Sequence, residues 1–369
     1  MYGKAMPCAA VITYEVDPDR PADQHLRAAR QELGRRLAEF LGCPFEGEFS
    51  PDRRYGGRTY FIPGDTLDAA TASALNIKGE DDLFGGVVPA PFIATKSITH
   101  SLIDPCAAAP AGWSHPLGAR LTNAVLNGCS AFSRDDARRA GTQLLERGAV
   151  RTKPALASAG RDQTVVTDRV ELGRVLDIMG EDAIACGLVI EENLVAVETF
   201  SVGQVRVAGH VASYFGVQRM TTDNFGEPVY GGSDLLVAPG NFDVLLALDL
   251  SDKARLAVSQ ARIYDASAFE AFPGLFASRR NYDVVSGRDS SGEQRMGVLE
   301  QSWRMGGASA AELAALEAFR ADPTLRAVRA SSFEAYGAVE PPVGATIYFL
   351  GVDNRIGPMA RYSTVEAHD

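Results

Sequence analysis

The segment 297–307, Gly-Val-Leu-Glu-Gln-Ser-Trp-Arg-Met-Gly-Gly, constrains the fold more than any other part of the sequence. If it is a β-strand, its period of two places polar side chains on one face and a different set on the other. The polar set is Glu300, Ser302 and Arg304, and the other set is Leu299, Gln301 and Trp303. Residues 282–286 are β-rich, and 287–294 are rich in turn formers. The sequence therefore predicts a hairpin that brings Asp283 beside Glu300.

Two neighbouring carboxylates repel each other unless a cation lies between them. Magnesium prefers oxygen and is commonly held by one or two carboxylates together with the phosphates of a nucleotide. Arg304 adds a fixed cation for phosphate or carboxylate oxygens, and Gly306–Gly307 lets the backbone approach a ligand closely. A solvated hairpin with ordinary surface charges is the alternative, because such spacings are common by chance.

Composition narrows the class of protein. The chain has 369 residues, enough for two or three domains, and its 46% hydrophobic and 22% charged content is typical of globular proteins. A net charge of −11 argues against a general nucleic-acid or anionic-membrane binder. No apolar run approaches the roughly 20 residues that span a bilayer, and the first residues lack a secretory-signal pattern. The five scattered cysteines indicate reduced thiols without a zinc site, so we expect a cytoplasmic protein.

The first third of the chain has the pattern of an α/β layer. A strand is predicted over 8–14 and an amphipathic helix over 21–41, with a short helix carrying Lys96 further along. The proline-rich stretch 105–118 is predicted to be a linker or surface loop. A second unit begins near Leu121.

Lys153 lies at the end of a predicted strand, before the small-residue turn 156–163. Backbone N–H groups in such a turn and the lysine ammonium can bind phosphate together. A solvated lysine at a strand end is the alternative interpretation.

The segment 186–218 is β-rich and predicts an antiparallel sheet. Glu198 lies within an apolar part of it and therefore needs a hydrogen-bonding partner. Ribose hydroxyls would serve, as would Arg206 or Arg219. Later elements are expected as helices over 133–147, 244–264 and 308–319 and as closing strands over 328–336 and 346–351.

Taken together, these elements resemble the ATP-grasp superfamily. Glu300-Gln-Ser-Trp-Arg304 is similar to the E-x-N-x-R motif on the last strand of its central sheet, with the serine variant found in the formate-dependent transformylase branch. The resemblance spans about 121–307 and implies a mixed α+β and α/β protein in which two α+β lobes grip ATP behind an α/β N-terminal domain. The implied divisions are 1–120 for the N-terminal domain, 121–310 for the ATP-grasp region with a lid over 130–187 and a central sheet over 188–307, and 311–369 for a C-terminal helix and closing strands packed on the central lobe.

The resemblance also implies roles for individual residues. Lys153 resembles the lysine that contacts the α- and β-phosphates, and Lys96 resembles an earlier ATP-contacting lysine. The segment 189–194 resembles the hinge that hydrogen-bonds adenine. The implied hinge residues are Glu191, Glu192 and Leu194, the implied ribose acid is Glu198, and the implied magnesium ligands for one or two ions are Asp283, Glu300 and Ser302. Asn281 holds the place where an arginine is often found two residues before the first metal carboxylate.

The activity implied is that of an ATP- and Mg²⁺-dependent ligase that activates a carboxylate as an acyl phosphate for attack by an amine, a thiol or another nucleophile. Lys153 and Arg304 would contribute by positioning and by neutralising charge on the transferred phosphoryl group. The partners implied are small-molecule carboxylates and nucleophiles, with a homodimer as the commonest assembly. His100, His115 and His210 fit structural or surface roles better than that of a general base.

Two other functions remain open at this stage. One is an ATP-binding regulatory or scaffold protein of the same fold with reduced catalysis, which Ser302 favours. The other is a Rossmann-type oxidoreductase, which is disfavoured because no G-x-G-x-x-G follows an early strand.

Overall fold

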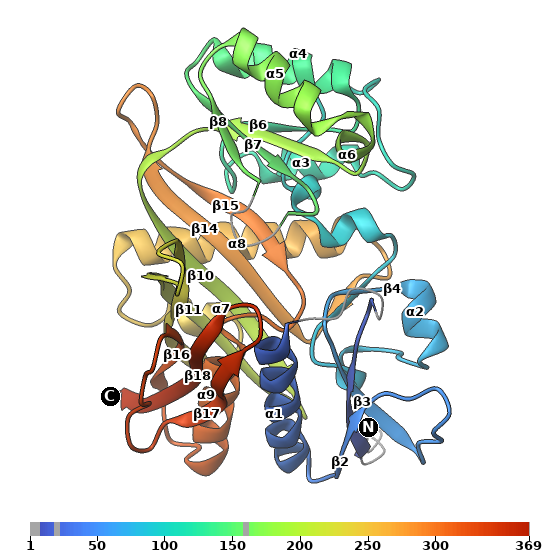
Figure 1. Cartoon of the computed structure of the whole chain (residues 1–369), viewed down its shortest axis with the longest axis vertical. Helices are drawn as coiled ribbons and strands as arrows, with labels where there is room; N and C mark the ends of the chain where they lie inside the picture. Colours follow the sequence, from blue (N-terminus) through green and yellow to red (C-terminus); the bar gives the residue numbers. More distant parts are fainter. Residues whose placement is uncertain (1–7, 18–22, 158–161, 369) are drawn as a thin grey trace.

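The computed structural model describes residues 8–17, 23–157 and 162–368, and within these ranges the chain forms four β-sheets with helices packed against them. Figure 1 shows a small lobe of strands and helices at the top, a large sheet through the middle and the N-terminal strands at the base. The expected mixture of α and β elements is confirmed. The division of the chain at 120 and 310 stays a prediction, so the elements are described sheet by sheet.

The N-terminal sheet is parallel and has the strand order β2-β1-β3. Its elements are β1 (Cys8–Tyr14), α1 (Gln24–Leu41), β2 (Phe45–Glu48) and β3 (Arg58–Pro63). The predicted strand and helix are thus present, although positions 21 and 22 lie outside the described residues. Helix α1 buries Leu33 and Leu37 completely, because they recur on one helical face. Gly42 ends the helix with φ near 70°, a conformation that glycine adopts without strain.

A small second sheet attaches this N-terminal part to the large sheet. It has the order β13-β5-β4, with β4 (Leu67–Asp68), α2 (Ala69–Ala74), β5 (Gly86–Val88) and β13 (Phe276–Ala277). Gly86 lies so close to Trp303 that a Cβ there would be 2.8 Å from the tryptophan Cβ. Thr66 Oγ1 also donates to the Trp303 carbonyl over 3.2 Å. The N-terminal part is therefore fixed against the end of the hairpin strand.

Short 3₁₀ turns follow, at Glu80–Asp82, Pro91–Ala94 and Lys96–Thr99. The helix expected around Lys96 is therefore a single 3₁₀ turn, η3 (Lys96–Thr99). Lys96 is buried in it.

The upper lobe is built on an antiparallel sheet of order β6-β9-β7-β8. Its elements are β6 (Gly128–Ala131), α4 (Arg134–Leu145), β7 (Val150–Pro154), β8 (Thr164–Val166), α5 (Arg169–Met179), α6 (Glu181–Ala185) and β9 (Leu188–Glu192). Helix α3 (His115–Leu121), which precedes β6, packs on the core around α8 (Asp252–Ala271) instead. Ser133 caps α4 as predicted, its Oγ accepting from the Asp136 N–H. Strand β9 pairs within this lobe, whereas the expected ranges placed it in the central sheet. Of the turn predicted over 156–163, residues 158–161 lie outside the described residues.

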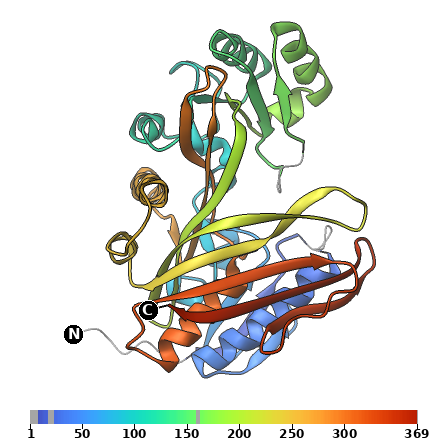
Figure 2. The same cartoon turned by 90° about the vertical axis from the view of Figure 1, so that its left-hand side faces the viewer.

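The large sheet is antiparallel throughout its pairings, with the order β15-β14-β10-β11-β12-β16-β18-β17. Its strands are β10 (Val195–Val207), β11 (His210–Thr222), β12 (Pro228–Pro239), β14 (Arg279–Arg288), β15 (Gln294–Ser302), β16 (Ala327–Tyr336), β17 (Thr346–Asp353) and β18 (Gly357–His368). The closing strands thus continue this sheet, and β18 is a strand that the sequence pattern did not predict. Figure 2 shows the long strands from the side, with α8 nearly end-on beside them.

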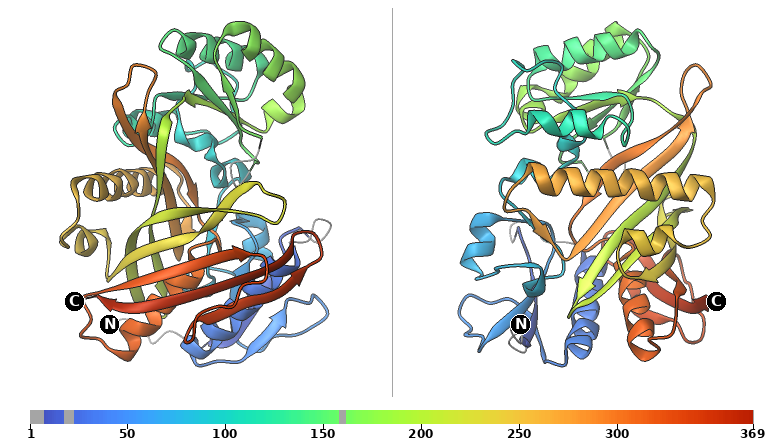
Figure 3. Two further views of the ribbon diagram at one scale, coloured as in Figure 1. Left: turned by 60° about the vertical axis from the view of Figure 1, so that its left-hand side comes forward. Right: turned by 180° about the vertical axis from the view of Figure 1, so that it is seen from behind.

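Helices cover both faces of the large sheet. One face packs on α7 (Phe242–Leu246) and α8 (Asp252–Ala271), and the other packs on α1 and α9 (Ser309–Ala321). Figure 3 shows α8 lying across the sheet in the right-hand view. The single helix expected over 244–264 is in fact two helices, because Ser251 caps a new one by accepting from the Ala254 N–H. None of the described helices is long and apolar enough to cross a membrane.

Candidate functional site

The predicted carboxylate pair is present. Asp283 of β14 and Glu300 of β15 are direct partners in the antiparallel register, so their side chains share one face of the sheet. The next pair in the register is Val284 with Val298, which leaves Leu299 as the extra residue of a β-bulge. Because of the bulge, Val298 faces the α8 core while Glu300 faces the opposite side. A local irregularity of the strand therefore turns Glu300 towards Asp283.

Asp283 is oriented by two amides and is only partly buried. Asn281 Nδ2 and Gln218 Nε2 both donate to its Oδ1, over 3.0 and 2.9 Å. Burial, and then the nearby Glu300 carboxylate, raise the pKa of Asp283 to about 6 against the opposing effect of these hydrogen bonds. Two hard oxygen donors that repel each other fit a divalent cation such as Mg²⁺. No group of three or more His, Cys, Asp or Glu side chains among the described residues is placed to bind a metal.

Lys96 lies at this carboxylate pair. Its Nζ is 3.0 Å from Glu300 Oε2 and donates to the carbonyl of Ala157 over 2.6 Å, with the Ala155 carbonyl at 3.4 Å. It thus joins the end of β15 to the segment that follows β7 in the upper lobe. The fold brings three of the predicted residues together here, namely Lys96, Asp283 and Glu300.

Lys153 belongs to a second cluster, inside the upper lobe. Its Nζ forms an ion pair with Glu191, and His100 Nε2 lies 3.1 Å from the other oxygen of that carboxylate. All three residues are buried. Burial alone would raise the pKa of Glu191, but the charge of Lys153 and the hydrogen bond from His100 outweigh it and hold the pKa at about 2. Gly128 makes room for the imidazole, since a Cβ there would lie 2.7 Å from the ring.

The remaining predicted hinge residues lie at the end of β9 and just after it. Glu192 accepts from the backbone N–H and side-chain amide of Asn127 over 2.9 and 3.1 Å. Leu194 is buried in a small cluster with Leu126 and Val285. The Glu191 side chain points into the upper lobe and contacts Lys153. At this residue the hinge could therefore contact a ligand only through its backbone N–H and carbonyl groups.

Glu198 is not brought to the site. On β10 it opposes Ser286 of β14, whereas Asp283 is opposed by Ser201, three residues further along β10. Side chains alternate between faces, so Glu198 faces the other side of the sheet. There it forms an exposed ion pair of 2.8 Å with Lys253 of α8. The carboxylate needed a polar partner, as predicted, but that partner is a lysine of the covering helix.

Ser302 and Arg304 lie at and beyond the end of β15. Ser302 opposes Asn281 on the face of the carboxylate pair, and its carbonyl accepts from Arg279 Nη1 over 3.3 Å. Arg304 lies outside the strand, with its Nε 3.3 Å from Asp65 Oδ1 of the N-terminal part. The site residues from the sequence are thus divided between the carboxylate pair, the buried cluster of the upper lobe and the sheet end.

A buried network behind the carboxylate pair was not predicted. Arg279, which is fully buried, donates to both oxygens of Glu312 in α9 and to the Arg304 carbonyl. The Tyr214 hydroxyl lies 2.6 Å from Glu312 Oε1 and 2.9 Å from Asn281 Oδ1. Because Asn281 in turn donates to Asp283, the network fixes one of the two amides that orient this carboxylate.

One signal for this network is present in the sequence. Glu312 precedes Leu316 and Phe319 by four and seven residues, so it shares their buried stripe on α9. An acid on an apolar stripe requires a buried cationic partner. The pattern does not show which arginine provides it.

Comparisons with solved structures define the class of fold. The biotin carboxylase of Campylobacter jejuni, in a complex named for β,γ-ATP, is similar over 97% of this chain and 87% of its own, with a TM-score of 0.52 at 12% identity. The biotin carboxylase domain of Hydrogenobacter thermophilus 2-oxoglutarate carboxylase, with MgADP and bicarbonate, is similar over 99% and 87%, with a TM-score of 0.50 at 10% identity. The protein has an ATP-grasp fold, which confirms the resemblance deduced from Glu300 to Arg304.

A protein-family model also matches the sequence of this chain. Residues 11–363 match the family described as "Protein of unknown function (DUF3182)", and the chain belongs to it. A search of curated proteins found no significant sequence match.

Proposed function

We propose that this protein is an ATP- and Mg²⁺-dependent ligase that activates a carboxylate as an acyl phosphate and transfers the acyl group to an amine, a thiol or another nucleophile. The observation that carries the proposal is the direct pairing of Asp283 with Glu300, with Lys96 beside them, on an ATP-grasp scaffold. A partly buried like-charge pair with a neighbouring lysine is suited to a metal-bound polyphosphate.

In this proposal Asp283 and Glu300 hold Mg²⁺, as one or two ions, and the Ser302 hydroxyl lies at the edge of the same ligand set. The metal, when bound, would neutralise charge on the phosphates. Lys96 and Lys153 would donate to phosphate oxygens, leaving the carboxylates that they contact in the structure.

The adenine would lie at the hinge formed by Glu191, Glu192 and Leu194. Glu198 has no part in this proposal, because it faces the opposite side of the sheet. Arg304 would leave Asp65 to approach the transferred phosphoryl group. Its guanidinium would then offset negative charge in the transition state.

The proposed chemistry has two steps. A substrate carboxylate oxygen attacks the γ-phosphorus of ATP, the bond to the β,γ-bridging oxygen breaks, and ADP leaves. The nucleophile then attacks the acyl carbon, and inorganic phosphate departs as a proton is lost from the nucleophile. The chain contributes orientation and charge neutralisation to both steps. We place this reaction in the cytoplasm, with small-molecule substrates and a homodimer as the assembly.

A second candidate is an ATP-binding regulatory or scaffold protein with reduced catalysis. The buried ion pair between Lys153 and Glu191 favours it, because a phosphate ligand would have to displace a carboxylate that is already well paired. Serine at position 302 in place of the usual asparagine points the same way.

The test is ADP release by the full chain with Mg²⁺, ATP and pools of amino acids, small carboxylates and amines, with products identified by mass. Asp283→Asn and Glu300→Gln should each abolish turnover. Glu293→Gln, an exposed acid in the turn of the same hairpin, is the matched control and should leave it unchanged. ATP binding without turnover would support the regulatory protein, and failure to bind ATP would contradict both candidates.

A further inference from the structure

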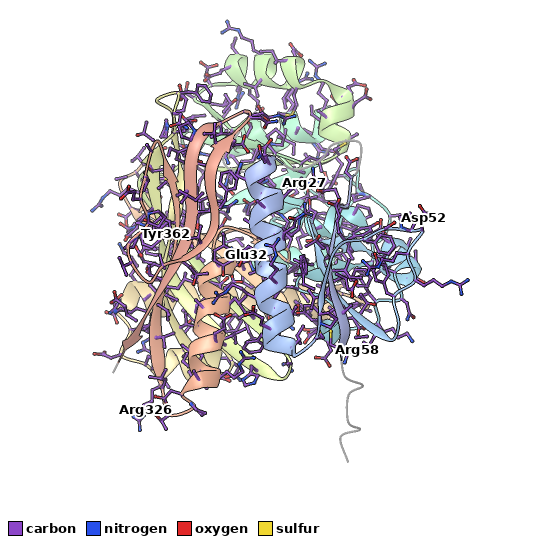
Figure 4. The ribbon with its side chains drawn as sticks, turned by 60° about the horizontal axis from the view of Figure 1, so that its bottom comes forward. Arg27, Glu32, Asp52, Arg58, Arg326 and Tyr362 are labelled. Carbon is purple, nitrogen blue, oxygen red and sulfur yellow. The ribbon has the colours of Figure 1, made fainter. Side chains whose placement is uncertain are left out.

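A hollow opens beyond the end of β15. It encloses about 290 Å³ of space, open solvent at its mouth included, and lies between α1, the start of α9 and strands β16 and β18. Its lining includes Met305, Gly306, Gly307, Ala310, Glu334 and Arg361. Figure 4 shows α1, marked by Arg27 and Glu32, running beside the strands that carry Tyr362. The hollow thus begins a few residues after the predicted metal motif.

The strand register places this hollow on the same sheet face as the carboxylate pair. Gln218, which donates to Asp283, opposes Ser233 of β12. Ser233 in turn opposes Ser332 of β16, which lines the hollow. Directly opposed residues of antiparallel strands lie on one face. A row of polar side chains therefore leads from the carboxylate pair to the hollow.

Arg361 supplies an unused donor at this place. The residue is 8% exposed, and its Nη2 donates to Glu334 Oε1 over 2.5 Å. Its other terminal nitrogen, Nη1, is buried and has no hydrogen-bond partner among the described residues. A buried N–H group without a partner is unfavourable, because it has lost its water. An acceptor oxygen entering the hollow would satisfy it.

The start of α9 adds a second source of positive potential. This helix has 13 residues and begins after Ala308, whose side chain cannot cap it. The Ser309 N–H donates to the Gly306 carbonyl over 3.1 Å, and the other N–H groups of the first turn, together with the helix dipole, favour an anion there. Gly307 allows the chain to pass close to Tyr230, since a Cβ would lie 2.4 Å from its ring. The close packing brings the helix start against β12, and Gly307 and Arg361 of β18 line the same hollow.

We propose that this hollow binds a carboxylate group of the substrate, with Arg361 Nη1 and the first turn of α9 as its donors. The inference rests on the proposed function and deepens it, because it assigns the substrate a binding place and a named donor on this chain. Glu334 offsets part of the Arg361 charge, so a singly charged carboxylate fits better than a phosphate dianion.

The test is binding of defined probes to the full chain, measured by thermal shift and calorimetry. The probes are succinate, glutamate, succinamide and inorganic phosphate, each with and without MgADP. The two carboxylates should stabilise the wild-type chain, and succinamide should not. Arg361→Gln should weaken carboxylate affinity roughly tenfold to a hundredfold, as expected for loss of a charged hydrogen bond. Arg361→Lys keeps the charge but loses the planar fork, so it should recover only part of the affinity.

The matched control is Arg329→Gln, an exposed arginine of β16, which should bind the carboxylates like wild type. Arg361→Gln could fail to fold because it leaves Glu334 without its partner. In that case the double variant Arg361→Gln/Glu334→Gln, which removes both charges, is used in place of the single variant. Absence of any carboxylate effect on the wild type, equal affinity in the Arg361 variants, or tighter binding of phosphate would overturn the proposal. MgADP affinity is measured on every variant, so a failed carboxylate site is distinguished from a failed nucleotide site.

Discussion

The carboxylate pair at the hairpin and the buried cluster of the upper lobe both hold an acid in a protected place, but with opposite electrostatics. Burial by itself acts to raise the pKa of both Asp283 and Glu191, but other charges set the net shift. At Asp283 the neighbouring charge is the Glu300 carboxylate, and the pKa rises to about 6. At Glu191 the neighbours are Lys153 and His100, and the pKa falls to about 2. Burial acts in the same direction at both carboxylates, so the sign of the neighbouring charge is what distinguishes the two pKa values.

This contrast predicts two kinds of ligand response. The upper cluster is already neutralised by groups of the chain, so a phosphate must compete with Glu191 for Lys153. At the carboxylate pair Lys96 contacts Glu300 alone of the two acids, and the positive charge of Arg279 opposes the rise in the pKa of Asp283 only in part. A divalent cation would relieve the repulsion that remains at Asp283.

The largest expected effect comes from breaking the neutralised cluster. Lys153→Met leaves Glu191 buried without its cation, and we expect a loss of about 3–5 kcal/mol in the free energy of unfolding, measured with urea. Adding Glu191→Gln should recover part of this loss, because no bare charge remains. Lys253→Met, in the exposed pair with Glu198, is the control and should change stability by about 0–1 kcal/mol. A small effect of Lys153→Met would show that the ion pair does not form in solution.

At the carboxylate pair we expect a substitution to increase the free energy of unfolding instead of lowering it. Asp283→Asn without metal should stabilise the chain at pH 7 by about 2 kcal/mol. The rise of its pKa from 3.8 to about 6 corresponds to about 3 kcal/mol, and partial exposure reduces this. A raised folded pKa makes ionisation unfavourable, so the gain should be complete above about pH 6 and absent below about pH 4. Unfolding curves at pH 3.5 and 7 measure it, and destabilisation at pH 7 would contradict the repulsion.

A third measurement compares how pH acts at the carboxylate pair, through MgADP affinity, and at the buried cluster of the upper lobe, through stability. Protons compete with a metal at Asp283, so the affinity for MgADP should fall by up to about tenfold for each pH unit below about 6. Asp283→Asn should remove this dependence. Glu191 has a lowered pKa, so its contribution to stability is complete above pH 4.5 and is lost only as the pH falls towards 2. Calorimetry from pH 5 to 8 tests the first statement, and a flat wild-type profile would refute it.

The smallest effect is expected at Glu198. Glu198→Gln removes one exposed ion pair with Lys253, so stability should change by less than about 1 kcal/mol. ATP affinity should change less than about twofold, because the side chain faces away from Asp283. A tenfold loss of ATP affinity would restore Glu198 as a ribose ligand and show that the sheet face has been assigned wrongly.

Much of the fold followed from local patterns. The hairpin of β14 and β15, the pairing of Asp283 with Glu300 and the capping of α4 by Ser133 all agree with the sequence. These features depend on residues a few positions apart or on strands joined by one turn. Their register is set by turn length and by the alternation of side chains.

Other features could not be read in this way. Alternation along β10 shows that Glu198 shares a face with Phe200, but it does not show whether that face meets a helix or a ligand. The bulge at Leu299 changes the face of every residue after it. Strand β18 completes the large sheet, although its own sequence is mixed and was not predicted as a strand.

The linear pattern of residues determined the hairpin and the kinds of side chain that it presents, because alternation and turn chemistry act over short distances. The tertiary structure alone decided which charges meet. His100 and Glu191 are 91 positions apart, and Arg279 and Glu312 are 33 apart, and each pair meets only after several strands and helices have packed. Coulomb interactions depend on distance in space, so neither the pKa of a carboxylate nor the availability of a lysine can be deduced from sequence spacing.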